Sequence, residues 1–176
     1  MDSGKDRSDA PCLLFLDFDD VVCLNNPYGG RHLHLPADRR PVDLWERLWH
    51  GPSVDALTAI LAEHRPRVVI TSSWLRFIDR DACEALLHVS GLAVVAQALH
   101  AAWEAPQNYG QTRCQAIEKW LASHHRNEPF VVLDDALSGT GLAGSSLDAA
   151  GRVILCEVNE GLGPKHVELV RRALAT

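Results

Sequence analysis

Long hydrophobic runs are absent from this sequence of 176 residues. Its apolar runs, such as residues 68–70 and 130–133, are far too short to cross a bilayer. Residues 1–11 are mostly polar and charged and contain no apolar core of the kind found in secretory signals. We therefore expect a cytoplasmic protein that has no membrane partner.

Closely spaced cysteine pairs are also lacking, since the five cysteines are odd in number and widely scattered along the sequence. Zinc sites and disulfide-exchange motifs need closely spaced pairs, so neither kind of site is expected. We interpret the cysteines as reduced and mostly buried. They are Cys12, Cys23, Cys83, Cys114 and Cys156.

Positive charge is also in short supply, because 17 Lys and Arg stand against 23 Asp and Glu, for a formal net charge of -6. The chain as a whole lacks the basic footprint of a dedicated nucleic-acid or anionic-membrane binder. A local basic cluster remains open, since Arg31, Arg39 and Arg40 are close in sequence. The proportions of hydrophobic residues (47%) and charged residues (23%) are those of a globular protein.

Short apolar runs alternate with helical stretches, which predicts an α/β fold with a parallel five-stranded sheet and helices on both faces. A chain of this length fits one domain, which we expect over residues 11–176 after a flexible tail at residues 1–10. The predicted strands are residues 12–16, 68–70, 92–95, 130–133 and 153–156. The predicted helices are residues 54–63, 81–89, 112–123 and 164–174.

A segment at about residues 25–50 separates the first predicted strand from the helix at 54–63. It combines a long loop rich in Gly, Pro, Arg and His with a short predicted helix at 43–50. That helix carries Trp45 and Trp49 one turn apart. Same-face aromatic residues usually pack against a core, which is the favoured interpretation. Stacking on nucleobases, with the nearby arginines on phosphates, is the alternative.

Acidic and hydroxyl side chains follow three of the predicted strands. Asp17, Asp19 and Asp20 come after the first, Thr71, Ser72 and Ser73 after the second, and Asp134 and Asp135 after a later one. Ligands of parallel sheets bind beyond the carboxyl ends of the strands, where two acidic ends can converge on one hard cation. Each group taken alone fits a turn or a helix cap equally well.

The order and spacing of these groups resemble the haloacid dehalogenase (HAD) superfamily. The matching motifs are residues 13–19, ending in Asp17-Phe18-Asp19, residues 68–71, ending in Thr71, and residues 131–135, ending in Asp134-Asp135. Residues 71–74, 113–121 and 160–162 resemble more closely the small branch of RNA-repair-associated HAD domains. The resemblance implies a Rossmann-like HAD core, and the short insert leaves room for only a minimal cap.

The resemblance also implies a mechanism and assigns roles to individual residues. Asp17 would be the nucleophile that forms an aspartyl-phosphate, and Asp19 would be its acid/base partner. Mg²⁺ would be held by Asp17, the backbone carbonyl of Asp19, Asp134 and Asp135, with Asp135 the preferred direct ligand of the pair. Phosphate oxygens would be bound by Thr71, Ser72 and one basic residue, for which Arg113 is the first choice and Lys119 the second.

The sequence departs from the family pattern directly after Asp19, where the common Gly-Thr is replaced by Asp20-Val21. The expected function is a Mg²⁺-dependent phosphatase, that is, a hydrolase of phosphate esters. The minimal cap predicts an open site, which favours phosphate on a nucleotide or nucleic-acid end. Two alternatives remain: a catalytically silent module that binds a phosphorylated ligand, and a phosphotransferase with an acceptor other than water.

Overall fold

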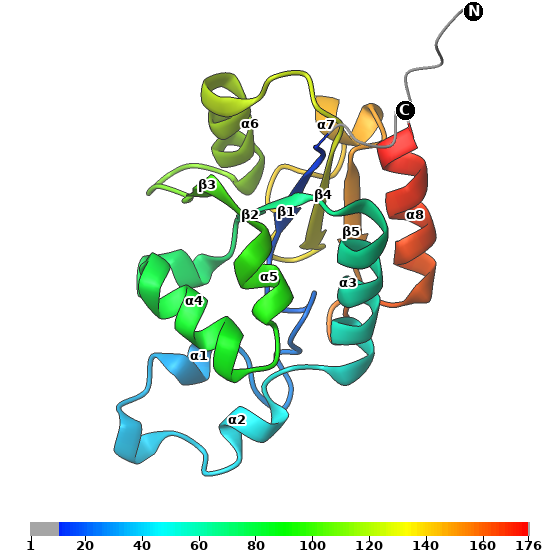
Figure 1. Cartoon of the computed structure of the whole chain (residues 1–176). Coiled ribbons are helices and arrows are strands. Elements are labelled where there is room, and N and C mark those ends of the chain that lie inside the picture. Colours follow the sequence, from blue (N-terminus) through cyan, green and yellow to red (C-terminus); the bar gives the residue numbers. More distant parts are fainter. Residues whose placement is uncertain (1–10, 176) are drawn as a thin grey trace, which may run out of the picture.

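The computed structural model describes residues 11–175 and contains one sheet of five parallel strands (Figure 1). The strand order is β3-β2-β1-β4-β5, so β1 lies in the centre. The predicted fold class, an α/β Rossmann-like core, is confirmed. The flexible tail predicted at residues 1–10 lies outside the described residues. The strands are β1 (Leu13–Leu16), β2 (Arg67–Ile70), β3 (Leu99–Glu104), β4 (Phe130–Asp135) and β5 (Val153–Cys156).

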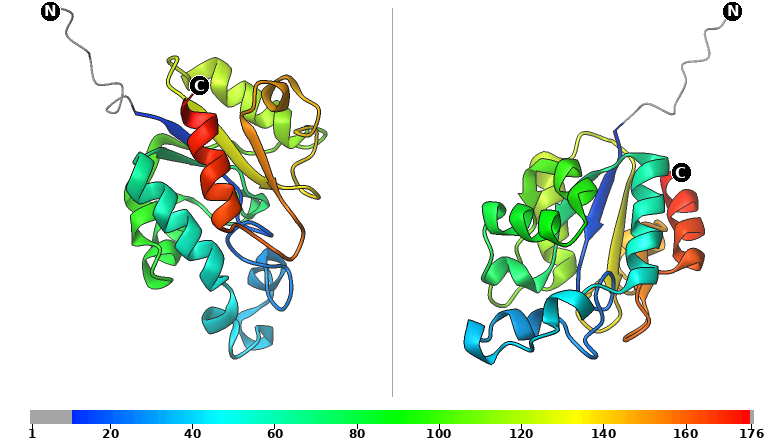
Figure 2. Two further views of the ribbon diagram at one scale, coloured as in Figure 1. Left: turned by 90° about the vertical axis from the view of Figure 1, so that its right-hand side faces the viewer. Right: turned by 60° about the horizontal axis from the view of Figure 1, so that its bottom comes forward.

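Helices cover both faces of the sheet (Figure 2). The α-helices are α1 (Gly30–Leu33), α2 (Leu44–Arg47), α3 (Gly51–His64), α4 (Arg80–Val89), α5 (Ala93–Ala98), α6 (Arg113–His124), α7 (Ser146–Ala149) and α8 (Pro164–Ala175). Two 3₁₀ turns, η2 (Ala37–Arg39) and η3 (Ser73–Arg76), complete the set. None of the helices within residues 11–175 has the length and apolar character needed to cross a membrane.

The core is split in two by the alternation of side chains along the strands. Leu14 and Leu16 of β1 point to the face covered by α3, α4, α5 and α8, whereas Leu13 and Phe15 point to the face covered by α6 and α7. The strand is buried on both faces, which explains its uninterrupted apolar sequence. Burial on both sides fixes the register of β1, and therefore the position at which Asp17 leaves the sheet.

The strand predicted at residues 92–95 is wrong, because this segment enters helix α5 and the edge strand is β3. A short apolar run does not distinguish a strand from a buried helical turn. The true strand is hard to recognise because it lies at the sheet edge, where only Leu99 and Trp103 are fully buried.

Residues 25–50, hereafter the flap, lie at the carboxyl end of the sheet (Figure 2). The flap contains α1, η2 and α2 rather than one continuous loop and a helix over 43–50. The predicted helix is thus shorter than expected and ends at Arg47, before Trp49. Cys23 forms one isolated backbone β-bridge with Asp19 and another with Trp49. The second bridge brings the end of the flap back to the loop after β1.

Candidate active site

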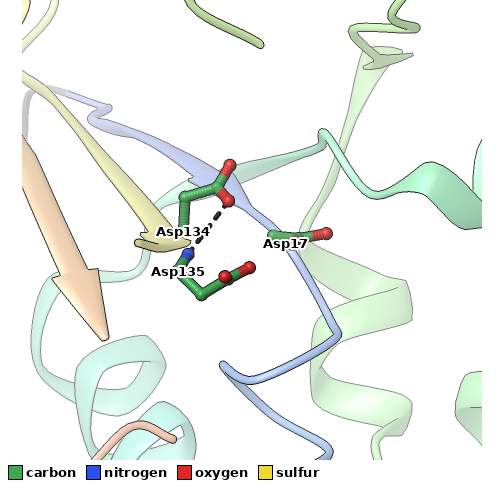
Figure 3. A group of neighbouring side chains, drawn as sticks. All are labelled: Asp17, Asp134 and Asp135. Carbon is green, nitrogen blue, oxygen red and sulfur yellow. Dashed lines mark hydrogen bonds between the residues drawn. The ribbon is translucent and has the colours of Figure 1, made fainter. Parts of the chain in front are cut away.

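The adjacent strands β1 and β4 bring three carboxylates together at the carboxyl end of the sheet. The two strands pair in parallel, with Leu16 opposite Leu133, and the amide of Asp17 donates a hydrogen bond to the Leu133 carbonyl (3.0 Å). Asp17 therefore emerges next to Asp134 and Asp135, and oxygen atoms of all three lie within 4.8 Å of one another (Figure 3). Each of the three residues is at most 1% exposed. The two acidic strand ends thus converge, as the sequence predicts.

Asp135 is held rigidly by the loop that follows β4. One carboxylate oxygen accepts hydrogen bonds from the backbone amides of Leu137 (2.7 Å) and Ser138 (2.9 Å). The Ser138 hydroxyl lies within hydrogen-bonding distance of the other Asp135 oxygen and of Asp17 Oδ2 (3.1 Å). A hydroxyl has one proton, so Ser138 donates to one carboxylate at a time. Ser138 was missed by sequence reasoning, since a lone serine in a Gly- and Ser-rich loop carries no specific signal.

Arg113 supplies the positive charge of the site. It begins helix α6, whose N-terminus is capped by Thr112, and Thr140 Oγ1 accepts a hydrogen bond from its backbone amide (2.9 Å). The guanidinium lies 3.1 Å from Asp134 Oδ2 through Nε and 3.7 Å from Asp17 Oδ1 through Nη2. The residue is 1% exposed. Arg113, the first choice for the basic residue, therefore lies inside the carboxylate cluster.

Lys119, the second choice, does not reach the cluster. It lies on α6 beyond Arg113, is exposed, and borders a pocket with Glu104 and Trp120 that none of the three aspartates lines. Residues six positions apart on a helix project in different directions, because the helix repeats every 3.6 residues. Arg113 and Lys119 therefore serve different surfaces of α6.

Negative charge is in excess at this centre, where one guanidinium faces three carboxylates. Burial raises the pKa of Asp17, and the nearby Arg113 opposes that rise. Burial followed by repulsion from Asp17 raises the pKa of Asp134 well above its ordinary value. Asp17 Oδ1, Asp134 Oδ2 and Arg113 Nη1 are buried and have no hydrogen-bond partner among residues 11–175. The Arg113 ion pair with Asp134 is close but not aligned as a hydrogen bond.

This donor set fits a hard divalent cation. Carboxylate oxygens are the preferred ligands of Mg²⁺, and a cation offsets the repulsion between buried carboxylates. The two cluster oxygens without a hydrogen bond, Asp17 Oδ1 and Asp134 Oδ2, are both ion-paired with Arg113, so the cluster keeps an excess of negative charge for a cation to offset. Asp17, Asp134 and Asp135 are thus the side chains that could hold such an ion. The side chain of Asp19 lies outside this group.

Thr71 and Ser72 leave the end of β2, the strand beside β1. Both are buried, and Thr71 Oγ1 has no hydrogen-bond partner within the described chain. Ser72 caps η3 by accepting a hydrogen bond from the Trp74 amide (3.4 Å), and its hydroxyl also stabilises the Asp17 carboxylate. The structure therefore places a free buried hydroxyl and a second hydroxyl next to the acidic cluster.

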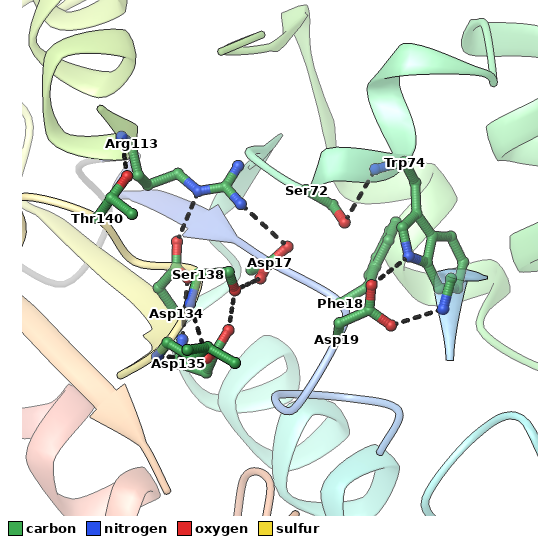
Figure 4. A network of polar contacts seen from close by, with 12 residues as sticks. Asp17, Phe18, Asp19, Ser72, Trp74, Arg113, Asp134, Asp135, Ser138 and Thr140 are labelled. Carbon is green, nitrogen blue, oxygen red and sulfur yellow. Dashed lines mark hydrogen bonds and ion pairs between the residues drawn. The ribbon is translucent and has the colours of Figure 1, made fainter. Parts of the chain in front are cut away.

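Asp19 lies beside the cluster, and its carboxylate is turned toward Trp74 (Figure 4). Oδ2 accepts a hydrogen bond from Trp74 Nε1 (2.8 Å), and Oδ1 accepts one from the backbone amide of Gly30 in the flap (2.7 Å). The Cys23 thiol makes a longer contact with Oδ1 (3.4 Å), and burial followed by repulsion from Asp19 raises the thiol pKa well above its usual range. Asp19 is therefore the link between the strand end and the flap.

Asp20 explains how the chain manages without the Gly that commonly follows Asp19. It adopts a left-handed backbone conformation, with φ of 57°, which Asp tolerates better than most residues. Its carboxylate accepts hydrogen bonds from the Asn25 backbone amide (3.3 Å), the Asn25 side-chain amide (2.8 Å) and the Asn159 backbone amide (3.0 Å). Asp20 thereby joins the loop after β1 to the flap and to the loop after β5.

The flap predicted to leave the site open comes close to the acidic strand ends. The three clustered aspartates are buried, and the flap contacts Asp19 directly. The flap approaches this closely because residues 29 and 30 are glycines: a Cβ on Gly30 would lie 2.0 Å from Trp74 Nε1. The small insert thus reaches the site, where the hydrogen bond from the Gly30 amide to Asp19 holds it.

The two flap tryptophans lie in different environments. Trp49 packs edge-on against Phe18 (ring centroids 5.8 Å apart) and lies next to Trp74 (5.7 Å), as the packing interpretation predicts. Trp45 is 51% exposed on α2. The difference arises because α2 ends at Arg47, so the two residues do not share a helical face.

Substitution of Arg113 with methionine is expected to destabilise the protein by about 3–5 kcal/mol, because a buried charge partner is lost. Asp17 and Asp134 would then be left without their only nearby cation among the described side chains. Urea unfolding at neutral pH in EDTA measures the change. Lys119→Met is the control, since Lys119 is exposed, and it should change the free energy of unfolding by less than about 0.5 kcal/mol. Equal effects of the two substitutions would contradict the assignment of Arg113 to the cluster.

Substitution of Gly30 with alanine is expected to push the flap away from Asp19, because the added Cβ would overlap the Trp74 ring. The flap tryptophan Trp49 packs on Trp74, so the displacement should change the intrinsic fluorescence. Gly51→Ala is the matched control, since nothing lies within 4 Å of the place that its methyl group would occupy at the start of α3. A Gly30→Ala spectrum identical to that of Gly51→Ala would show that the flap does not close as described.

The fold and the acidic strand ends together define an α/β protein of the haloacid dehalogenase superfamily, which indicates a phosphatase-type hydrolase. The family model described as "HAD domain in Swiss Army Knife RNA repair proteins" matches residues 13–167. The chain belongs to this family, and the resemblance drawn from its motifs is confirmed. The match extends from the start of β1 into α8 and includes all the site residues. No curated protein and no solved structure matches the chain.

Proposed function

We propose that the protein is a Mg²⁺-dependent phosphate-ester hydrolase that works through an aspartyl-phosphate on Asp17. The observation that carries the proposal is the buried convergence of Asp17, Asp134 and Asp135 on one point beside Arg113. Within residues 11–175 these three buried carboxylates share one guanidinium, an excess of negative charge that is costly in a purely structural cluster and that a bound cation would offset.

In the first step a carboxylate oxygen of Asp17 attacks the phosphorus of the ester. The bond between phosphorus and the ester oxygen breaks, and the leaving oxygen takes the proton of the Asp19 carboxyl group. The products are the aspartyl-phosphate, the free alcohol and an Asp19 carboxylate. Arg113, between Asp17 and Asp134, offsets the negative charge of the phosphoryl oxygens, and Thr71 and Ser72 donate hydrogen bonds to them.

In the second step Asp19 takes a proton from water, and the water oxygen attacks the phosphorus. The bond between phosphorus and Asp17 breaks, which releases inorganic phosphate and regenerates the Asp17 carboxylate and the Asp19 carboxyl group. When bound, Mg²⁺ supplies positive charge that reduces the repulsion between the carboxylates and the phosphate. Asp17, Asp134 and Asp135 would hold it with the backbone carbonyl of Asp19, and Asp135 is our preferred direct ligand of the pair because Arg113 contacts Asp134.

The substrate class that we favour is a nucleotide or a phosphorylated nucleic-acid end. The family description, which refers to RNA repair proteins, supports it. So does the exposed Trp45 ring on the flap, which is available for stacking on a base. Only part of the basic cluster is available, because Arg40 donates hydrogen bonds to the carbonyls of Leu33 and Leu35. The five cysteines are unpaired, which suits a cytoplasmic protein.

Two other functions use the same site. A silent module that binds a phosphorylated ligand has no need for a nucleophile with an acid/base next to it, so the pairing of Asp17 with Asp19 favours an enzyme. A phosphotransferase shares the first step and differs only in the acceptor of the second. Product analysis in the presence of added alcohols separates transfer from hydrolysis.

The test is release of inorganic phosphate from p-nitrophenyl phosphate, a panel of nucleotides and 5′- or 3′-phosphorylated oligonucleotides, each with Mg²⁺ or with EDTA. The proposal predicts Mg²⁺-dependent release and the highest kcat/KM among the nucleotide or oligonucleotide substrates. Binding of these ligands without release from any of them would favour the silent module.

A further inference from the structure

We infer that Trp74 is a positioning residue for the general acid, because it fixes the carboxylate oxygen of Asp19 that carries the transferable proton. The inference rests on the proposed function and adds a residue to it. Trp74 lies in η3, the turn that directly follows Thr71 and Ser72, and its side chain is completely buried. Its indole N–H donates the hydrogen bond of 2.8 Å to Asp19 Oδ2 (Figure 4).

The hydrogen bonds around Asp19 distinguish its two oxygens. Oδ1 receives the Gly30 amide and also lies 3.4 Å from the Cys23 thiol, whose one proton is shared between this oxygen and the Phe18 carbonyl at the same distance. Oδ2 receives only the Trp74 indole, so one acceptor position remains on it. A proton bound there leaves all three hydrogen bonds in place. Oδ2 is therefore the oxygen from which the proton reaches the leaving group.

The direction of Asp19 agrees with this role. In an in-line displacement the attacking and leaving oxygens lie on opposite sides of phosphorus, so the general acid has to lie away from the nucleophile. Asp17 faces Arg113 and Ser138, whereas Asp19 faces Trp74 and the flap (Figure 4). The acid is thus held on the flap side, where an in-line leaving group would emerge.

The indole is itself held firmly. Its ring packs against Phe18 (centroids 4.9 Å apart), Trp49 (5.7 Å) and Phe77 (6.4 Å), so it has little freedom to move. The N–H is buried, so solvent does not compete for this hydrogen bond. Loss of the indole donor would remove the hydrogen bond at Oδ2 that opposes rotation of the Asp19 carboxylate away from its present direction.

Dependence on the leaving group tests this role separately from packing. Protonation matters much more for phenyl phosphate than for p-nitrophenyl phosphate, because nitrophenolate is the more stable anion and leaves with little help from an acid. The quantity to compare is kcat/KM, which reports formation of the aspartyl-phosphate. Trp74→Phe keeps an aromatic ring and removes the donor. We expect it to lower kcat/KM for phenyl phosphate at least about 10-fold more than for p-nitrophenyl phosphate, within the contribution of a general acid.

Trp120→Phe is the matched control. Trp120 is also buried, and its indole N–H donates to the Ala102 carbonyl (2.9 Å) on the other face of the sheet. Its loss should change kcat/KM for the two substrates by the same factor. The ratio of the two values is insensitive to the fraction of misfolded protein, because one preparation serves both substrates. Trp74→Met, which fills the space flexibly without a donor, is the second variant if the phenylalanine variant does not fold.

An equal loss for both substrates in the Trp74 variants, or no loss, would overturn the positioning role and leave the proposed function intact. Absence of Mg²⁺-dependent turnover in the wild-type protein with these two substrates and with every nucleotide and oligonucleotide of the panel would overturn the proposed function itself, and the role of Trp74 with it. A selective loss for phenyl phosphate in the Trp74 variants alone is the supporting result.

Discussion

Substitution of Asp17 with asparagine is expected to lower kcat by a factor on the order of 10⁴ or more, which in a routine assay is complete loss of turnover. Asparagine has nearly the shape of aspartate but an uncharged amide, which does not attack phosphorus to form an acyl-phosphate. The measurement is phosphate release from the best substrate of the panel with saturating Mg²⁺. Wild-type-like turnover in this variant would refute the assignment of the nucleophile.

The same substitution is expected to leave the fold intact and its stability equal or higher in the absence of metal. Burial raises the pKa of Asp17, so ionisation of this group destabilises the folded state as the pH rises above the unfolded-state value of about 3.9. Asparagine has no charge and removes this cost at neutral pH. Urea unfolding in EDTA measures the change. A marked loss of stability would show that the lost turnover reflects unfolding rather than chemistry.

Removal of the divalent cation is expected to abolish turnover and to lower the melting temperature. A ligand at 100 times its Kd stabilises a folded protein by about 2.7 kcal/mol, which corresponds to roughly 5–10 °C for a chain of this size. The physical reason is the excess of three buried carboxylates over one guanidinium. Thermal unfolding with increasing Mg²⁺ measures the shift, and phosphate release with and without EDTA measures the activity.

The Asp135→Asn variant tests whether the rise in melting temperature with Mg²⁺ comes from binding at the cluster. Asp55→Asn is its control. Asp135 lies in the three-carboxylate group, whereas Asp55 is an exposed residue of α3. The Asp135 variant should lose most of the Mg²⁺-induced rise in melting temperature, and the Asp55 variant should keep it. A rise retained in both variants would place the cation somewhere else on the protein.

The central strands and the acidic cluster could be predicted from the sequence because local pattern and function coincide there. Asp17 and Asp134 each follow a run of apolar residues that only a doubly buried strand accommodates. Adjacent parallel strands then place their carboxyl ends side by side, with no further information needed. The position of Arg113 could be predicted for a similar reason, since the start of a helix is set by local capping residues.

The flap, the edge strand and the surroundings of Asp19 could not be predicted in this way. Trp74 and Asp19 are 55 residues apart, and their hydrogen bond depends on how η3 and the loop after β1 pack in three dimensions. Gly30 gives no local sign that its missing side chain admits the Trp74 ring. Ser138 likewise acquires its contacts only when β1 and β4 pair. These features depend on long-range packing rather than on local periodicity.

The most direct test of the proposed function is identification of the phosphorylated residue. Wild-type protein is mixed with excess substrate and Mg²⁺, quenched in acid within the first turnovers, reduced with borohydride and digested, and the peptide that contains Asp17 is analysed by mass spectrometry. Reduction of an acyl-phosphate converts aspartate to homoserine, and we expect this conversion at position 17 only when substrate and Mg²⁺ are both present. Steady turnover with the modification at another residue, or with none under conditions in which release of the alcohol shows an initial burst, would contradict the aspartyl-phosphate mechanism.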